Sequence, residues 1–216
     1  MAQSSPLEAR DLTAAVQDYA KAIYTLESRN GAASTNELAA LLAVRPASVS
    51  GMLRKLSALG LVEHERYRGV RLTDRGRRVA LEVIRHHRLV ELFLVESLGM
   101  TWDEVHPEAE VLEHALSEEL EELIAAKLGN PTVDPHGDPI PSRELKLAET
   151  AGPALAELEP GETATFVRIS DSEPEMLRFL GERGIAPGAR LELVDRQPFD
   201  GPLFVRVGDD VHVLGA

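Results

Sequence analysis

Residues 35–73 read TNELAALLAVRPASVSGMLRKLSALGLVEHERYRGVRLT, and the pattern of this stretch changes twice. Thr35 offers an N-cap for a short helix over residues 36–42, which a break before Pro46 ends. Pro46 suits the first turn of a second helix that extends to about Leu59. A short helix, a tight turn and a longer helix are the outline of a helix-turn-helix.

The second half of the stretch predicts a β-hairpin. Two short extended runs within residues 61–73 flank a basic tip that contains a glycine. Thr73 then caps a long helix and places Asp74 in its first turn, where the helix dipole favours an acid. Upstream, apolar residues at helical spacing predict a further helix over residues 12–28. The sequence therefore predicts a winged helix-turn-helix over residues 1–74.

Apolar helices continue beyond this unit. We expect one helix over residues 74–98 and another over residues 107–128. The buried side of the second is marked by leucines at helical spacing, namely Leu112, Leu116, Leu120 and Leu123. Such helices need a partner surface, and a second copy of the chain is the simplest one. Residues 75–150, which include the proline-rich connection 129–141, are therefore predicted to form a helical dimerisation domain.

The remainder, residues 151–216, changes character. Short Val-rich runs over residues 163–170, 190–195, 203–207 and 211–214 are separated by Gly, Pro and Asp, with one helix at 174–183. This pattern predicts a small β-barrel. The fold class is therefore mainly α with small β, in three domains.

Composition excludes several classes of function. The 216 residues contain no cysteine, which excludes disulfides, thiolate metal sites and cysteine nucleophiles. No apolar run approaches the roughly 18 residues of a membrane span. The first residues, MAQSSP, have neither the basic nor the apolar region of a signal peptide. We expect a cytoplasmic protein with no membrane partner.

The net charge of −13 hides an asymmetry that bears on nucleic acid. Residues 1–78 carry twelve Lys and Arg against eight Asp and Glu, whereas the rest carries eleven against twenty-eight. A basic N-terminal third suits double-stranded DNA as a partner. The residues placed for contact with bases or phosphates are Thr35, Asn36, Arg45, Pro46, Ala47, Ser48, Ser50, Gly51, Arg54, Lys55, Arg66 and Arg68.

The acidic part contains a pattern typical of a metal site. On one helix, His106, Glu110, Glu113 and His114 would fall within an arc of about 100°. His87 and Glu91 lie one turn apart on the preceding helix. Imidazole and carboxylate without sulfur suit Mn²⁺, Fe²⁺ or Zn²⁺. Glu118, Glu119, Glu121 and Glu122 are interpreted as solvated residues of a helix surface, and His64, His86, His136 and His212 as ordinary surface or core residues.

Several segments together resemble a known family. They are Asp18-Tyr19 with Ile23-Tyr24, YRGVRLT at 67–73, HRLVE at 87–91, the His106 to His114 set, and PHGDPIP at 135–141. The chain resembles the diphtheria-toxin repressor family of metal-dependent transcriptional regulators, which has iron-responsive and manganese-responsive branches. The resemblance covers essentially the whole chain, and it implies that the C-terminal barrel is SH3-like (FeoA-like).

The resemblance also implies two metal sites. A primary site would consist of Asp18, Glu110, Glu113 and His114, and an ancillary site of His87, Glu91 and His106. A carboxylate or amide from the C-terminal domain sometimes completes the ancillary site, and Glu173 and Glu175 lie in the matching segment. Iron-type members have a methionine and a cysteine where this chain has Asp18 and Glu110, so Mn²⁺ is favoured over Fe²⁺. Lys21 stands where some manganese-type members have a second acid.

The functional hypothesis is a homodimeric repressor that divalent metal, at about two sites per chain, activates to bind an inverted-repeat operator. The resemblance implies metal-homeostasis genes, above all those of metal uptake, as targets. One alternative is a winged-helix regulator without metal control. Another is a di-metal enzyme, which a paired Glu-x-x-His on two helices would favour. Because only one carboxylate and histidine group of this kind is present, Glu110 and Glu113 with His114, and the sequence indicates no substrate pocket, we expect no enzyme activity.

Overall fold

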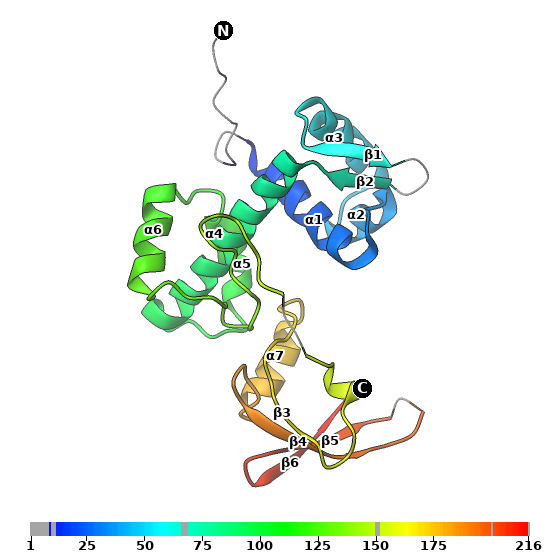
Figure 1. Ribbon diagram of the computed structural model, residues 1–216, viewed down its shortest axis with the longest axis vertical. Coiled ribbons are helices and arrows are strands. Elements are labelled where there is room, and N and C mark those ends of the chain that lie inside the picture. The colour runs from blue at the N-terminus through cyan, green and yellow to red at the C-terminus, as the bar shows by residue number, and fades with distance from the viewer. Residues whose placement is uncertain (1–8, 10–11, 66–68, 150–151, 200, 216) are drawn as a thin grey trace. The chain divides into compact units, whose positions relative to one another are not determined.

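The computed structural model describes residues 9, 12–65, 69–149, 152–199 and 201–215 (Figure 1). The chain divides into two compact units, which are described separately. The first comprises Met1–His87, Glu110–Lys127 and Pro141–Leu147. The second comprises Arg88–Ala109, Leu128–Ile140 and Ala148–Ala216. None of the helices in the described ranges is long and apolar enough to cross a membrane.

The helix-turn-helix is present in the first unit. Helices α1 (Ala14–Asn30), α2 (Thr35–Leu41) and α3 (Pro46–Ala58) share one apolar core. Pro46 occupies the first turn of α3, as predicted. The N-cap of α2 is Ser34 rather than Thr35, because the Ser34 hydroxyl accepts from the Glu37 amide while the Glu37 carboxylate accepts from the Ser34 amide.

The predicted wing is also present, as strands β1 (Val62–Glu65) and β2 (Gly69–Leu72) paired antiparallel. Beyond this hairpin, Val70 and Ala33 exchange two backbone hydrogen bonds of 2.9 and 3.0 Å. Gly69 has φ +111°, and a Cβ there would lie 2.2 Å from the Ala33 carbonyl oxygen. The close pairing therefore requires glycine. Arg66 and Arg68 fall outside the described residues.

Helix α4 (Asp74–Leu98) begins where the sequence predicts. The Thr73 hydroxyl accepts from the Gly76 amide at 3.1 Å and donates to the Gly60 carbonyl at 2.8 Å. The single helix predicted over residues 107–128 is wrong, because the structure has α5 (Val105–Leu112) and α6 (Glu118–Lys127) with a turn between them. Ser117 starts α6 by accepting from the Leu120 amide through its hydroxyl.

The leucines expected on the buried side of that helix are largely exposed. Leu112, Leu120 and Leu123 are 42%, 48% and 63% exposed. The break after α5 changes the phase between the two helices, so a single apolar stripe no longer faces one core. An exposed apolar surface of this kind is typical of an interface with another chain.

The C-terminal region lies in the second unit and contains β3 (Thr163–Thr165), α7 (Pro174–Gly181), β4 (Arg190–Arg196), β5 (Leu203–Val207) and β6 (Asp210–Leu214). A short 3₁₀ turn, η2 (Leu155–Glu157), precedes them. The strands form one antiparallel sheet in the order β3-β4-β5-β6, with a small apolar core from β4 and β5. Within the described residues β3 and β6 do not pair, so the sheet is not the closed barrel that was predicted.

Candidate metal centres and DNA-binding surface

The first cluster joins α1 to the turn that follows α5, inside the first unit. Ligand atoms of Asp18, Glu113 and His114 all lie within 4.8 Å of one another. Asp18 Oδ1 is 2.9 Å from His114 Nε2, and the Glu113 side chain is fully buried. Burial raises the pKa of Asp18; His114 lowers it in part, but the neighbouring carboxylates raise it again. A cation at this point would offset the cost of burying the ionised Asp18 carboxylate and would reduce its repulsion from the neighbouring carboxylates.

Gln17 orients the His114 ring, and the sequence analysis did not predict this role. The Gln17 amide nitrogen donates to the carbonyls of Ala9 and Leu12 at 2.8 and 3.2 Å. Its oxygen must therefore accept, and it lies 2.6 Å from His114 Nδ1. Protonation at Nδ1 leaves Nε2 to face Asp18 as a potential ligand. A polar residue beside the apolar stripe of α1 was the available signal.

Glu110 belongs to a neighbouring group in the same unit, which shares Glu113 with that trio. Lys21 Nζ donates to Glu110 Oε1 at 2.7 Å and to the two Glu113 oxygens at 3.0 and 2.8 Å. His87 donates from Nδ1 to Glu113 Oε2. Burial lowers the pKa of Lys21, but the carboxylates of Glu113 and Glu110 outweigh it, so this pKa is raised. Burial likewise raises the pKa of Glu113, but His87 and Lys21 bring it below the ordinary value.

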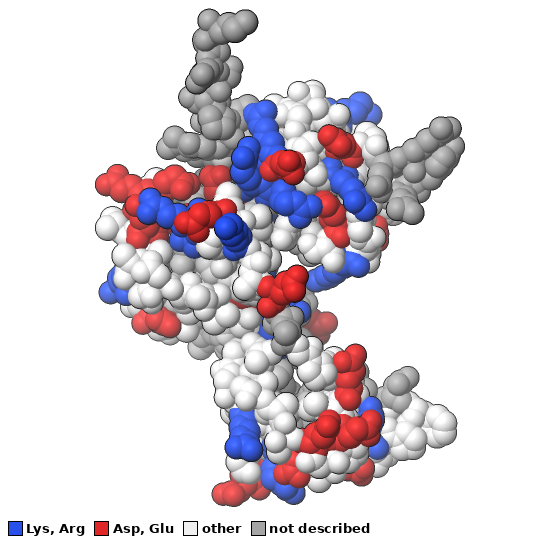
Figure 2. Space-filling model, in the orientation of Figure 1, with Lys and Arg blue, Asp and Glu red and all other residues white. Residues whose placement is uncertain are grey.

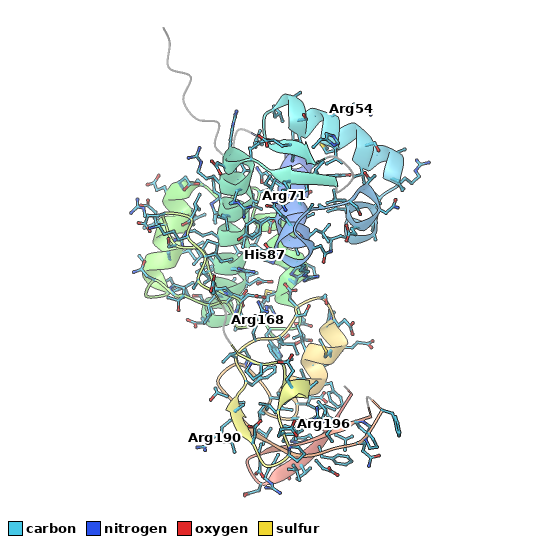
Figure 3. The ribbon with its side chains drawn as sticks, turned by 45° about the vertical axis from the view of Figure 1, so that its right-hand side comes forward. Arg54, Arg71, His87, Arg168, Arg190 and Arg196 are labelled. Carbon is cyan, nitrogen blue, oxygen red and sulfur yellow. The ribbon has the colours of Figure 1, made fainter. Side chains whose placement is uncertain are left out.

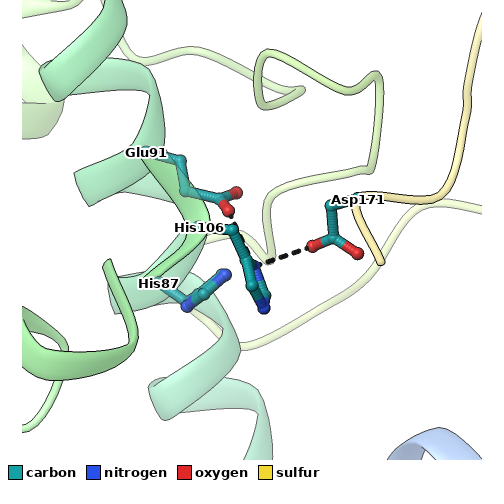
Figure 4. Close-up of side chains that lie close together, drawn as sticks. All are labelled: His87, Glu91, His106 and Asp171. Carbon is teal, nitrogen blue, oxygen red and sulfur yellow. Dashed lines mark hydrogen bonds and ion pairs between the residues drawn. The ribbon is translucent and has the colours of Figure 1, made fainter. Parts of the chain in front are cut away.

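A second cluster lies in the second unit. Ligand atoms of Glu91, His106 and Asp171 are within 4.8 Å of one another (Figure 4). His106 Nδ1 is 3.2 Å from Glu91 Oε1 and 3.1 Å from Asp171 Oδ2. Hydrogen bonds to Asp171 and Glu91 raise the pKa of His106 to about 10, although burial opposes them. Glu91 comes from α4, where His87 precedes it by one turn.

The C-terminal carboxylate in this cluster is Asp171, not Glu173 or Glu175. Both glutamates are exposed, and Glu173 is the N-cap residue of α7. Asp171 lies two residues earlier, within the segment that the family resemblance indicated. Burial raises the pKa of Asp171, but the hydrogen bond from His106 and the charges of His106 and His136 together bring it below the ordinary value. Residue spacing could not identify Asp171, because the described segment between β3 and α7 forms neither a helix nor a strand whose repeat would indicate where the side chain points.

Three residues interpreted as ordinary prove to be buried beside opposite charges. His136 is fully buried, with Nε2 2.7 Å from the Trp102 carbonyl oxygen and Nδ1 3.6 Å from Glu91. Glu121 was interpreted as solvated but is 4% exposed, and it accepts from Arg85 at 2.7 Å. The same carboxylate lies 3.1 Å from His86 Nε2. Contacts between segments far apart in the sequence produce these pairs.

The outer face of α3 is a candidate surface for DNA. Val49, Leu53 and Leu56 turn inward, and this leaves Arg54 and its neighbours outside (Figure 3). Exposed residues on this face, at its start and on α2 are Asn36, Arg45, Pro46, Ala47, Ser48, Arg54 and Lys55, with Thr35, Ser50 and Gly51 half-buried. Basic and acidic side chains are interspersed on the visible face of this domain (Figure 2). The small residues permit close approach to a DNA groove.

Three family profiles match the chain. "Iron dependent repressor, N-terminal DNA binding domain" matches residues 11–70, and "Iron dependent repressor, metal binding and dimerisation domain" matches residues 73–142. The FeoA domain matches residues 154–216. The iron-dependent repressor IdeR of Mycobacterium tuberculosis is 31% identical over 93% of this chain and 92% of its own length. The chain belongs to the iron-dependent repressor family.

Solved structures of similar proteins agree with this assignment. A manganese-dependent transcriptional repressor in complex with manganese is 43% identical, with a TM-score of 0.84 over 93% of this chain and 94% of that one. ScaR with bound Cd²⁺ is 32% identical, with a TM-score of 0.78 over 93% of each chain. Iron-dependent repressors are transcriptional regulators, so the di-metal enzyme is not supported.

The donor set of this iron-dependent repressor fits a divalent ion. Both clusters combine buried carboxylates with imidazole, and the chain has no thiolate. In the first cluster, Gln17 orients the His114 ring so that Nε2 faces Asp18. These features suit Mn²⁺ and Fe²⁺ better than ions that prefer sulfur.

Proposed function

We propose that the chain is a homodimeric repressor in which divalent metal, Mn²⁺ in preference to Fe²⁺, activates operator binding. The observation that carries this proposal is the Asp18–His114 pair. Asp18 lies on α1 of the DNA-binding profile, whereas His114 lies in the metal-binding and dimerisation profile. A cation held by both therefore connects the position of the helix-turn-helix to the dimerisation helices.

The residue assignments belong to the same proposal. The primary site is Asp18, Glu113 and His114, with Glu110 as a further carboxylate. The ancillary site is Glu91, His106 and Asp171, with His87 one turn before Glu91 on α4. Contacts to an inverted-repeat operator come from α3, from the turn before it and from the wing. The domain boundaries are 1–74, 75–150 and 151–216.

The preference for Mn²⁺ follows from the carboxylates of Asp18, Glu113 and Glu110, since hard oxygen ligands suit Mn²⁺. The similar proteins include some named for iron and others named for manganese. A manganese- or iron-responsive repressor would act in the cytoplasm, where it meets its operator. The genes that it controls are those of metal homeostasis, with metal uptake foremost.

The decisive experiment is an operator-binding titration with protein first stripped of metal. Operator fragments are selected from random DNA in the presence of Mn²⁺, and their affinity is measured with Mn²⁺, with Fe²⁺ under anaerobic conditions, and with chelator. We expect specific binding only with metal, at lower Mn²⁺ than Fe²⁺, and a steep fall with salt because phosphate contacts dominate. Equal affinity with metal and with chelator would instead support the winged-helix regulator without metal control.

A further inference from the structure

Lys21 lies among three residues that by themselves form a metal-ligand set. Ligand atoms of His87, Glu110 and Glu113 lie within 4.8 Å of one another in the first unit. Lys21 Nζ is within 3.0 Å of three carboxylate oxygens of this set and 3.2 Å from His87 Nδ1. The Lys21 side chain is 19% exposed, so its charge is largely withdrawn from water. An ammonium group thus occupies a position that a divalent ion could take.

The hydrogen bonds of this ammonium group are fully used. A lysine has three N–H donors, and three carboxylate oxygens of Glu110 and Glu113 accept from Lys21. No lysine proton remains for His87, which is consistent with His87 Nδ1 donating to Glu113. Lys21 therefore satisfies the acids of this set as a bound cation would, but from within the chain.

We propose that Lys21 is a tethered cation that excludes a metal ion from the His87–Glu110–Glu113 set and thereby restricts the primary site to one divalent ion. The inference rests on the proposed function of that site. Because Lys21 lies on α1 three residues after Asp18, it approaches the cluster from the same helix as a proposed ligand. Repulsion between the ammonium group and a neighbouring divalent ion opposes a second metal.

A second consequence concerns Glu110. In this structure the Glu110 carboxylate is held by Lys21, whereas Asp18, Glu113 and His114 are already grouped. Glu110 can complete the primary site only by exchanging Lys21 for the metal. Lys21 competes with the metal for Glu110, and because it is part of the chain its effective concentration is always high. Lys21 therefore also raises the metal concentration that is needed to fill the primary site.

The test compares Lys21→Met, which keeps length but removes charge, with Lys21→Arg, which keeps the charge. Lys127→Met, at an exposed position of α6, controls for the loss of a lysine. All variants carry His106→Ala, which removes the second cluster from the count. Mn²⁺ stoichiometry and affinity are measured by equilibrium dialysis on metal-stripped protein, together with the electron paramagnetic resonance spectrum and the melting temperature of the metal-free form.

We expect one Mn²⁺ per chain for the His106→Ala parent, for Lys127→Met and for Lys21→Arg. Lys21→Met should bind two, with a spectrum broadened by coupling because the two sets share Glu113. The first ion should bind to Lys21→Met at least about tenfold more tightly than to the parent. The metal-free form of Lys21→Met should melt at a lower temperature than the metal-free parent, because the charges of Glu110 and Glu113 are then uncompensated. Lys21→Gln repeats the comparison if Lys21→Met does not fold.

One Mn²⁺ with unchanged affinity in both Lys21→Met and Lys21→Gln would overturn the proposal while leaving the primary site intact. A parent protein that binds no Mn²⁺ in the His106→Ala background would contradict the proposed function itself. The two failures are therefore distinguishable from the parent measurement alone.

Discussion

Single side chains determine the geometry of the first cluster. Two backbone carbonyls orient the Gln17 amide, the amide oxygen selects the protonated nitrogen of His114, and His114 then presents its other nitrogen to Asp18. Each step removes one rotamer or tautomer that would bind metal less well. The side chains of this cluster are thus ordered largely when the first unit folds, so little conformational entropy would remain to be lost on binding a cation.

The residue that tests this cluster is Asp18. Asp18→Asn keeps the size of the side chain but removes the charge that attracts a hard cation. We expect Mn²⁺ affinity at the primary site to fall at least about tenfold, with a matching loss of metal-stimulated operator binding. Dialysis and operator titration measure the two effects. Metal at Glu91, His106 and Asp171 should be retained, because Asp18 does not take part in that cluster.

Asp209→Asn serves as the matched control, since Asp209 is exposed in the C-terminal region. This variant should titrate like the unmodified protein. If Asp18→Asn also responds to metal normally, Asp18 does not link metal occupancy to DNA binding, and another group must do so.

At the scale of elements, the wing is joined to the helix-turn-helix by backbone pairing rather than by the hairpin alone. Residue Ala33, between α1 and α2, pairs with Val70 of β2, so the hairpin is held against the segment that leads into α2. This arrangement requires the backbones at Gly69 and Ala33 to approach more closely than any side chain permits. The position of the wing therefore depends on one glycine.

Gly69→Ala should accordingly destabilise the DNA-binding domain by at least about 2 kcal/mol, since the new Cβ meets a carbonyl oxygen and φ is positive. Gly60→Ala is the control, because Gly60 has φ +70° but no atom within 4 Å of the added Cβ. It should cost only about 1 kcal/mol. Urea denaturation of both variants gives the comparison, and equal losses would mean that backbone conformation rather than the close approach sets the cost.

For the whole molecule, exposed apolar residues on α5 and α6 indicate how two chains associate. Val111, Leu112, Leu120 and Leu123 are exposed in the single chain, within the part that matches the metal-binding and dimerisation profile. Iron-dependent repressors contain this dimerisation domain beside a DNA-binding domain. A dimer brings two recognition helices to one operator, which a single chain cannot do.

The double variant Leu120→Asp with Leu123→Asp should therefore be monomeric, because two charges would be buried without partners at the interface. Its operator affinity should fall by more than about a hundredfold, since each chain then engages only one half-site. Light scattering and operator titration measure these losses. Phe199→Asp is the control: this side chain is 99% exposed outside the profile, and its variant should remain dimeric. A dimeric double variant would place the interface elsewhere.

How much the sequence alone predicts depends on how local the signal is. Pro46 in the first turn of α3, Thr73 before α4 and the wing strands were predictable, because each depends on neighbours within a few residues. The prediction from helical spacing was wrong at the turn after α5, because the apolar and acidic pattern continues there through residues that are not helical. Ser117 begins a new helix there, and the assumption of one continuous helix over residues 107–128 concealed its role as an N-cap.

Residue types and the family resemblance were enough to propose Asp18, Glu113 and His114 as ligands and a divalent ion as cofactor. Only the tertiary structure placed Gln17 behind His114, brought Asp171 to His106 and put Lys21 between Glu110 and Glu113. These contacts join residues 65 to 97 positions apart, and the separations follow no repeat. Chain folding sets such distances through the packing of whole helices, so residue types indicate the kind of site, whereas the contacts of Gln17, Lys21 and Asp171 depend on the fold.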